Sequence, residues 1–180
     1  MISVVVTTLN DAERLTATLA SLTPAAMDGL VREVIVCDGG SSDATLEIAE
    51  DAGANVLVDE RGLAGGAEAA RQPWLLILAV GTRLQVGWEQ AVRAHMRDYP
   101  DRAGWFDLAL ARTGLGVRVE EAMAGLESGL LARPRTQQGL LISKTVLDGL
   151  GSVRSHGDIV RKLGRARLRP LKARALSGMS

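Results

Sequence analysis

Short apolar runs that do not alternate with polar residues constrain the fold of this chain most strongly. Four occur in the first 80 residues: ISVVVTT from Ile2, EVIVCD from Glu33, NVLVD from Asn55 and WLLILA from Trp74. Such runs are typical of parallel strands that are buried on both faces. Segments with helical periodicity separate them. The sequence therefore predicts an α/β fold, with an open, mainly parallel sheet and helices on both faces.

The expected elements alternate along the chain. Helices are predicted at residues 12–22, 45–52, 61–72, 86–99, 117–132, 144–151 and 158–164. Further strands are predicted at 104–112 and 137–143, and an edge strand at 165–171, ended by Pro170. Gly65 and Gly66 weaken the helical propensity of 61–72, and Pro24 is expected just past the first helix. No repeat or linker divides the chain, so we expect one domain over residues 1–180.

Composition excludes several classes of protein. The 21 basic and 21 acidic residues give a formal net charge of +0, which offers no general attraction for nucleic acid. Cys37 is the only cysteine, so it cannot pair within the chain, and no Cys/His cluster indicates a metal site. We therefore expect a reducing, cytoplasmic location. The sequence contains no recognisable signal peptide and no run long enough to span a membrane.

Positive charge is concentrated near the C-terminus. Residues 154–174 contain eight basic side chains against one acid, Asp158, which gives this segment a net charge of +7. One interpretation is a solvated basic tail at residues 166–180. The other is contact with an anionic surface, such as lipid headgroups, an acidic partner or a phosphorylated substrate.

The stretch VIVCDGGSSDAT, residues 34–45, places a carboxylate at a strand end in front of a helix. Ligands of open parallel sheets bind beyond the carboxyl ends of the strands, and Gly39 and Gly40 allow a tight turn there. Ser42 or Asp43 is expected to cap the helix. Asp38 either accepts hydrogen bonds from this turn or contacts the ribose or base of a nucleotide. Dinucleotide-binding and Walker-type glycine motifs are absent from the sequence.

Taken in order, several segments resemble the family 2 glycosyltransferases of the GT-A fold. They are ISVVVTTLNDAERLTATLASL, EVIVCDGGSSDATLEIAEDAGANVL, WLLILAVGTRLQVGWEQAV and QQGLLISKTVLDGLG. The resemblance implies transfer of a sugar from a nucleotide-diphosphate donor, linked to UDP or GDP, to an acceptor. It also implies that Thr8 and Asn10 lie near the base or ribose, that Asp38 contacts the nucleoside, and that Gly39 and Gly40 permit its close approach.

The chain departs from this family where the chemistry takes place. Family members end the fourth strand with acids that hold Mn²⁺ or Mg²⁺ beneath the donor's phosphates, whereas residues 79–81 here read Ala-Val-Gly. We therefore expect no tightly bound metal. Arg61, Arg71 or Arg83 would supply positive charge if its side chain faces the crevice. Asp158 is the candidate catalytic base, with His156 as an alternative that we otherwise expect to be exposed.

Two classes of function remain open from the sequence. The first is a glycosyltransferase, with a nucleotide-binding half at residues 1–100 and an acceptor-side half at 101–165. The second is a catalytically degenerate homologue that acts as a nucleotide-binding or partner-binding subunit. In either case we expect a cytoplasmic protein, and contact of the basic segment 166–180 with lipid headgroups, if that interpretation holds, would make it peripheral to the inner face of the membrane.

Overall fold

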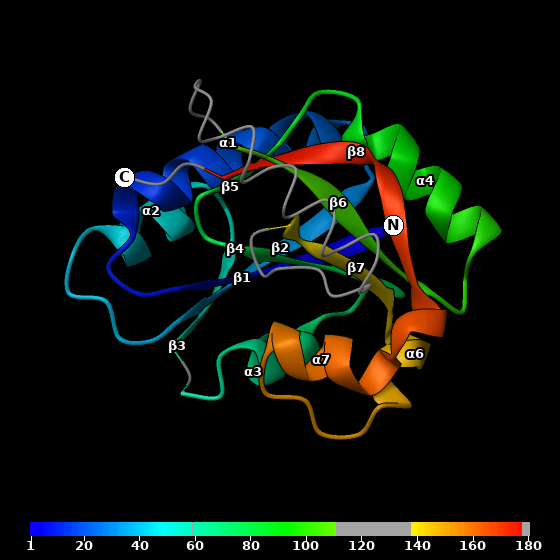
Figure 1. Ribbon diagram of the computed structural model, residues 1–180. Helices are drawn as coiled ribbons and strands as arrows, with labels where there is room; N and C mark the ends of the chain where they lie inside the picture. The colour runs from blue at the N-terminus through cyan, green and yellow to red at the C-terminus, as the bar shows by residue number, and fades with distance from the viewer. Residues whose placement is uncertain (59, 111–137, 178–180) are drawn as a thin grey trace.

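The computed structural model describes residues 1–58, 60–110 and 138–177. The strands are β1 Ile2–Thr8, β2 Val31–Asp38, β3 Asn55–Val58, β4 Trp74–Ala79, β5 Thr82–Leu84, β6 Ala103–Leu110, β7 Leu140–Ser143 and β8 Leu168–Ser177. The helices are α1 Ala12–Met27, α2 Thr45–Asp51, α3 Leu63–Ala69, α4 Trp88–Asp98, α6 Lys144–Asp148 and α7 His156–Leu163, with a 3-10 turn at Arg165–Arg167. Figure 1 shows the strands as one curled sheet between the helices.

The four predicted apolar runs form adjacent parallel strands. The order within the eight-stranded sheet is β3-β2-β1-β4-β7-β6-β8-β5, and Val5 of β1 lies opposite Ile35 of β2 and Ile77 of β4. This confirms the α/β class and the mainly parallel sheet. Among these four strands the expectation of burial is wrong only for β3, which lies at one edge of the sheet and leaves Val58 66% exposed.

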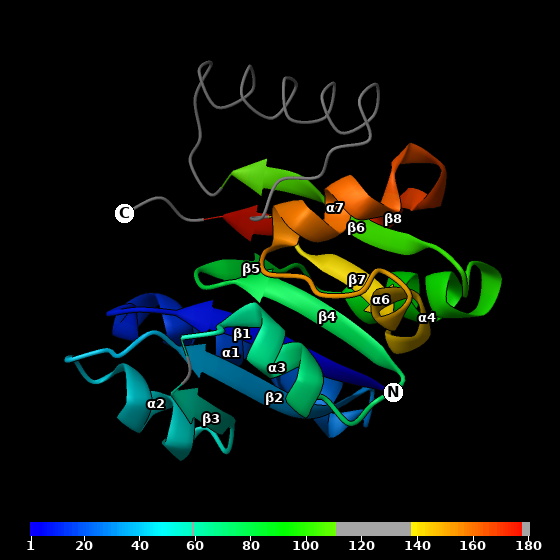
Figure 2. The same ribbon diagram turned by 90° about the horizontal axis from the view of Figure 1, so that it is seen from below.

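Alternate side chains of the strands enter two separate hydrophobic cores. Val4 and Val6 of β1 pack in the core that α1, α2 and α4 cover, whereas Val5 packs in the core beneath α3, α6 and α7. Figure 2 shows α3, α6 and α7 together on one face of the sheet. Both faces are therefore buried, which explains why the strands lack polar alternation.

Helix α3 packs unusually close to the sheet because of a glycine. A Cβ atom built on Gly66 would lie 2.6 Å from Cγ1 of Val5 and closer still to Sγ of Cys37. Both neighbours belong to buried strands. Gly66 weakens the helical propensity of this segment, but its lack of a side chain lets the helix backbone approach β1 and β2.

The second half of the chain completes and curls the sheet. Strand β7 is antiparallel to β4 and β6, and β8 is parallel to β6. Residues 175–177 of β8 pair with the short strand β5, which contacts α1. The expected basic tail at 166–180 is corrected by this pairing, because residues 168–177 form an integral strand. Pro170 lies within β8 and does not end it.

Most other predicted elements are confirmed, with two differences, and one predicted element is not tested. Helix α1 continues to Met27 and contains Pro24 in its last turns, so the expected stop at Pro24 is wrong. Strand β5 was not predicted, because three residues are too few to show a pattern. The helix predicted at 117–132 lies outside the described residues.

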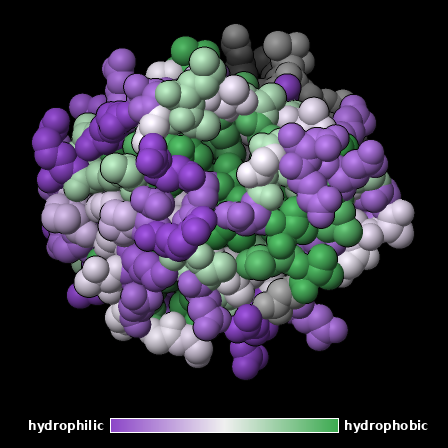
Figure 3. Space-filling view, turned by 180° about the vertical axis from the view of Figure 1, so that it is seen from behind, coloured by the Kyte–Doolittle hydropathy of each residue, from purple (hydrophilic) through white to green (hydrophobic). Residues whose placement is uncertain are grey.

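Some apolar surface remains open to solvent. A groove of about 570 Å³ between α1 and α2 is lined by Leu19, Ala20, Ala26 and Ile48, among others, and Met27 beside it is 85% exposed. Figure 3, which shows the molecule from behind, has a hydrophobic area bordered by hydrophilic side chains. Among the described residues, no helix combines the length and the apolar character needed to cross a membrane.

Candidate functional site

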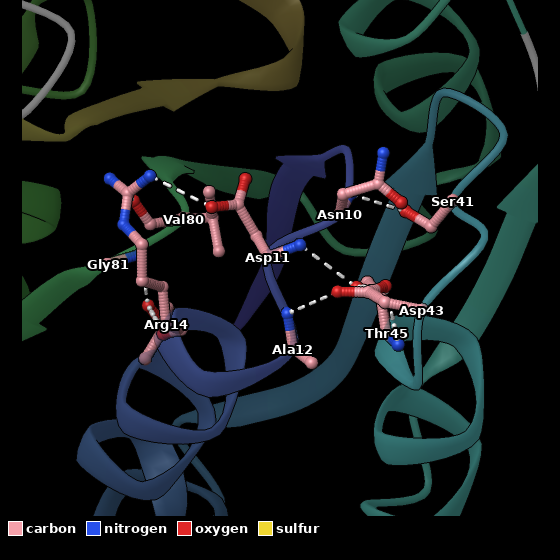
Figure 4. A network of polar contacts seen from close by, with 10 residues as sticks. Asn10, Asp11, Ala12, Arg14, Ser41, Asp43, Thr45, Val80 and Gly81 are labelled. Carbon is pink, nitrogen blue, oxygen red and sulfur yellow. Dashed lines mark hydrogen bonds and ion pairs between the residues drawn. The ribbon is translucent and has the colours of Figure 1, made fainter. Parts of the chain in front are cut away.

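Three loops meet at the carboxyl edge of the parallel strands. Strands β1, β2 and β4 end at Thr8, Asp38 and Ala79, and the register pairs Thr8 with Asp38. The loops that follow are residues 9–11, 39–44 and 80–81, and Figure 4 shows the polar contacts that join them. In open sheets of this type, this edge is where ligands bind.

The carboxylate of Asp38 is engaged by its own turn. Its Oδ1 atom accepts hydrogen bonds from the backbone N–H groups of Gly40 at 2.8 Å and Ser41 at 2.6 Å. Its Oδ2 atom accepts a bond from the Ser41 hydroxyl at 2.5 Å, and Asp38 is only 1% exposed. Gly40 takes a φ of +98°, which suits glycine. Of the two interpretations, turn formation accounts for the described bonds, and contact with a nucleotide stays a prediction.

Asn10 joins the loop after β1 to the loop after β2. Its Oδ1 atom accepts a hydrogen bond from the Ser42 N–H at 2.8 Å, and its own N–H donates to the Ser41 hydroxyl at 2.7 Å. Asn10 has a φ of +52°, a conformation that asparagine tolerates better than most residues. The predicted site residue therefore lies at the expected edge, where it fixes the relative position of the two loops.

A second set of bonds holds the start of α1 against the same loop. The Ala12 N–H donates to Asp43 Oδ2 at 3.2 Å, and the Asp11 N–H donates to the Thr45 hydroxyl at 3.0 Å. Asp43 Oδ1 also accepts bonds from the Thr45 N–H, at 3.0 Å, and from the Thr45 hydroxyl. The Thr45 hydroxyl bond is the main cause that lowers the pKa of Asp43. Asp43 thus binds the first residue of α2, but the N-cap residue is Ala44, so the expectation that Ser42 or Asp43 caps this helix is wrong.

Thr8 carries a buried hydroxyl that has no partner. The residue is 6% exposed, and its Oγ1 atom makes no hydrogen bond. Its carbonyl oxygen, in contrast, accepts a bond from the Gly39 N–H at 3.0 Å. Unpaired buried polar atoms are rare in folded proteins and are often found at sites of function.

The turn after β4 contacts an arginine instead of presenting an acid. Arg14, in the first turn of α1, donates from Nη2 to the carbonyl oxygen of Val80 at 3.1 Å and forms an ion pair with Asp11 at 2.9 Å. One helical turn later, the Thr18 hydroxyl accepts a hydrogen bond from the Gly81 N–H at 2.8 Å. The guanidinium group, Asp11 and the 80–81 turn lie together in Figure 4.

The three arginines named from the sequence occupy different places. Arg61 precedes α3 and pairs with Glu68 at 2.7 Å, and both side chains are exposed. Arg71 pairs with Glu33 at 2.9 Å near the start of β2 and β4, which is the opposite edge of the sheet, so its expected role in the crevice is wrong. Arg83 alternates on β5 with the buried residues Thr82 and Leu84, so its side chain points to the other face of that strand.

Asp158 lies in the first turn of α7. Its carboxylate accepts a hydrogen bond from the Arg154 N–H at 3.3 Å and pairs with Arg161. Its own N–H donates to the hydroxyl of the N-cap residue Ser155 at 3.2 Å. These bonds resemble a capping box, which stabilises a helix start. The strand pairings make β8 parallel to β4, so β8 starts at the edge of the sheet where the parallel strands start. Helix α7 leads to the start of β8, and its own first residues therefore lie toward the opposite edge, where the parallel strands end.

His156 is buried, which corrects the expectation that it is exposed. Only 5% of the residue is accessible, and its Nε2 atom has no hydrogen-bond partner. Burial lowers the pKa of His156 to about 4, because a charged imidazolium is poorly solvated there. The side chain is therefore neutral near pH 7.

A groove of about 790 Å³ lies beside α3, away from the loops that follow β1 and β2. Arg61 and Glu68 line the wall at α3, and Lys144 and Asp148 line the wall at α6. Further lining comes from residues 151–154, which end at Arg154. Arg154 is also the residue whose N–H binds Asp158. The groove therefore reaches the start of α7, and its rim carries both signs of charge.

The side chains at the end of β4 do not suit a divalent metal. Mn²⁺ and Mg²⁺ prefer carboxylate and other oxygen ligands, but Ala79, Val80 and Gly81 supply no side-chain oxygen. Among residues 1–58, 60–110 and 138–177, no group of three or more His, Cys, Asp or Glu side chains has the arrangement of a metal site. Asp11, an acid of the loop network that contacts this turn through Arg14, is already paired with that arginine.

Comparison with known proteins finds a family model that matches the first part of the chain. The model of glycosyl transferase family 2 matches residues 3–78, the segment that contains β1 to β4 and two of the three loops. The similarity to glycosyl transferase family 2 is therefore shown for this segment, which is less than half of the chain. No curated protein sequence matches the chain. The family 2 match covers the turn at Asp38, which was the most specific part of the resemblance in the sequence.

Solved structures of glycosyltransferases show that the chain has the GT-A fold. Staphylococcus aureus TarS superimposes with a TM-score of 0.73 at 16% identity, over 99% of this chain and 37% of TarS. A structure of TarS residues 1–349 gives 0.73 at 17% identity, and the chain spans 60% of its length. The glucosyl-3-phosphoglycerate synthase of Mycobacterium tuberculosis, in complex with Mn²⁺, UDP and glucosyl-3-phosphoglycerate, gives 0.66 at 20% identity over 99% of this chain and 70% of that one.

Sequence reasoning missed Arg14 and the buried hydroxyl of Thr8. Arg14 belongs to the predicted first helix, but its partner Val80 is 66 positions away along the chain. The one available signal was that the first turn of a helix after a strand lies at the strand's carboxyl edge. For Thr8 the sequence indicated the place but not the missing hydrogen bond.

Proposed function

We propose that this protein transfers a sugar from a nucleotide-diphosphate donor, linked to UDP or GDP, to an acceptor. The observation that carries the proposal is that the family 2 segment brings its loops together at one sheet edge, where the Thr8 hydroxyl lacks a partner. Related folds have been solved with UDP-GlcNAc, in TarS, and with UDP-glucose, in the mycobacterial synthase. Their bound donors support a nucleotide sugar here.

We place the nucleoside between the loops after β1 and β2. A ribose or base that enters there would give the Thr8 hydroxyl the hydrogen bond it lacks. Asn10 and the turn at Gly39 and Gly40 would hold the walls of this site, since hydrogen bonds already fix them to one another. For Asp38 to contact the nucleoside directly, the Ser41 hydroxyl would have to leave its Oδ2 atom.

We place the acceptor in the groove beside α3. Asp158 would act as the base that removes the acceptor's proton, because the groove reaches Arg154 and Asp158 binds that residue's N–H. Its carboxylate also forms an ion pair with Arg161, in the first turns of α7.

A nucleotide-binding subunit without transferase activity is the second candidate. Two observations favour it: no acid stands at the end of β4, and the bonds of Asp158 are those of a helix cap. Such a protein would keep the nucleoside site and lose the step in which the glycosidic bond breaks.

The exposed basic side chains of β8 suggest a surface for an anionic partner. Arg169, Lys172 and Arg174 are exposed, whereas Leu168 and Leu171 face the core. We propose that this strand contacts the anionic lipids of the membrane's inner face, and that the protein is cytoplasmic. Acidic headgroups attract exposed cations over roughly 8 Å at physiological ionic strength.

Release of nucleotide diphosphate separates the two candidate functions. The protein is incubated with UDP-glucose, UDP-GlcNAc or a GDP-sugar, with and without Mn²⁺, and with a lipid extract as a source of acceptors. A transferase releases UDP or GDP, and Asp158→Asn lowers this rate by about a hundredfold or more, as expected for loss of a general base. Donor binding without release supports the nucleotide-binding subunit, and absence of both contradicts the proposal.

A further inference from the structure

Arg14 is the cationic side chain bound directly to the turn where the family places its metal-binding acids. Its guanidinium lies 3.1 Å from the carbonyl oxygen of Val80, and 43% of the side chain is exposed. The turn is shaped to this contact, because Gly81 takes a φ of +85° and a Cβ there would lie 2.8 Å from Nε of Arg14. Any residue other than glycine would therefore displace the arginine.

Other sources of positive potential at this edge are already engaged. The N–H groups of Asp11 and Ala12 at the start of α1 are bonded to Thr45 and Asp43. The N–H groups of Gly40 and Ser41 are bonded to Asp38. A diphosphate would therefore find few free backbone donors, and its charge would need a cationic side chain or a metal.

The guanidinium group has donors to spare. Of its five N–H donors, two are accounted for by the bonds to Asp11 and the Val80 carbonyl. Its planar geometry suits two oxygens of a phosphate at once. Because the arginine is fixed at its far end by these two contacts, little side-chain freedom would be lost when a phosphate binds.

We propose that Arg14 binds the diphosphate of the donor nucleotide, in the place where a divalent metal acts in the family pattern. This inference rests on the proposed function, and it adds the residue that carries the phosphate charge. It explains how a chain with Ala-Val-Gly at the end of β4 would hold a nucleotide diphosphate. Binding of UDP would then depend little on added Mn²⁺.

The test compares UDP with uridine, which lacks the phosphates, by calorimetry on the full chain. Arg14→Ala should weaken UDP binding by at least about tenfold, since a hydrogen bond to a charged group contributes on the order of 1.5–3 kcal/mol. Uridine binding should change little. Arg93→Ala is the matched control, because it removes an exposed arginine that pairs with Asp28 at 2.6 Å, away from the loops.

Arg14→Gln provides a second variant that retains a donor for the Val80 carbonyl but removes the charge. It should show the same loss for UDP, so a folding defect in Arg14→Ala does not end the test. Equal UDP affinity in the parent and in Arg14→Gln, or a gain above about tenfold when Mn²⁺ is added to the parent, would overturn the role of Arg14 and leave the proposed function intact. Failure of the parent to bind UDP at all would contradict both.

Discussion

At the scale of single residues, the polar side chains at the strand ends first bind one another. Asp38 closes its own turn, Asn10 ties two loops together, and Asp43 holds the starts of two helices. A ligand would thus enter loops that are already fixed. Preorganised loops lose little conformational entropy on binding.

Substitution of Asn10 tests this arrangement. Asn10→Ala removes the bond to the Ser42 N–H and places a less tolerant residue at a φ of +52°. We expect the free energy of unfolding to fall by about 1–2 kcal/mol. Asn10→Gly is the matched control, because glycine accepts this φ, and it should lose less. Urea denaturation measures both, and a larger loss in the glycine variant would contradict the role of the backbone conformation.

The buried His156 predicts a dependence of stability on pH. Its pKa is about 4 in the folded chain against 6.5 for an unperturbed histidine. Because the folded pKa is depressed, the unfolded chain binds the proton more tightly, so stability is lost as pH falls from about 6.5 to about 4. The loss should reach about 3 kcal/mol. Chemical denaturation at several pH values measures it.

His156→Gln is the control for this effect. The variant should be less stable at pH 7, because it disturbs a buried position, yet its stability should fall less between pH 7 and pH 4. His95 acts in the same direction and remains in both proteins, since burial also lowers its pKa. A pH dependence identical to that of the parent would show that His156 does not contribute.

The sequence predicted at which edge of the sheet the site residues lie, but it did not predict which side chains they contact. Thr8, Asn10, Asp38, Gly39 and Gly40 lie at the predicted edge, because a strand that ends in a turn locates its own last residues. The burial of His156 and the partner of Arg14 depend on segments distant in sequence. A pattern of neighbouring residues carries no information about such contacts.

At the scale of elements, close packing of α3 provides the clearest test. Gly66→Ala should lower the free energy of unfolding by about 1–3 kcal/mol, since the added methyl group overlaps Val5 and Cys37. Gly157→Ala in α7 is the control, because the nearest atom that its added Cβ would meet is the Ser155 hydroxyl oxygen at 4.0 Å. Alanine favours helix, so that variant should be as stable as the parent or more so. Equal destabilisation of both variants would contradict the packing argument.

Strand β8 requires a test of its charge that leaves the sheet intact. Removing residues 165–180 would delete a strand paired with β6 and β5 and would unfold the chain. Arg169→Gln combined with Lys172→Gln instead changes two exposed side chains. Binding to vesicles with anionic lipids should weaken in this variant and should fall as salt rises. Absence of parent binding at low salt would contradict the membrane contact.

The elements that the sequence predicted best are those whose burial is complete. Strands β1, β2 and β4 follow from unbroken apolar runs, because both of their faces meet helices. Strand β5 has three residues and depends on pairing with β8, about 90 positions later. Pro24 could stay within α1 because the helix continues for only three residues after it.

At the scale of the whole molecule, the order of the strands in the sheet brings the three loops after β1, β2 and β4 to one edge. Residues 3–78 carry the family 2 match, and the rest of the described chain supplies the strands that complete the GT-A fold. The parallel order could be expected from the sequence, whereas the place of β8 between β6 and β5 could not. That position depends on pairing between distant strands.

Titration of ¹⁵N-labelled protein with UDP, followed by two-dimensional NMR, tests the central claim most directly. The account predicts that the largest shifts of amide signals fall in the loops after β1, β2 and β4, at Asn10, Gly39, Gly40, Ser41 and Gly81. Signals from the groove between α1 and α2, such as those of Ala20 and Ile48, should stay unchanged. Shifts confined to that groove, or no shifts at millimolar UDP, would contradict a nucleotide site at the carboxyl edge of the sheet.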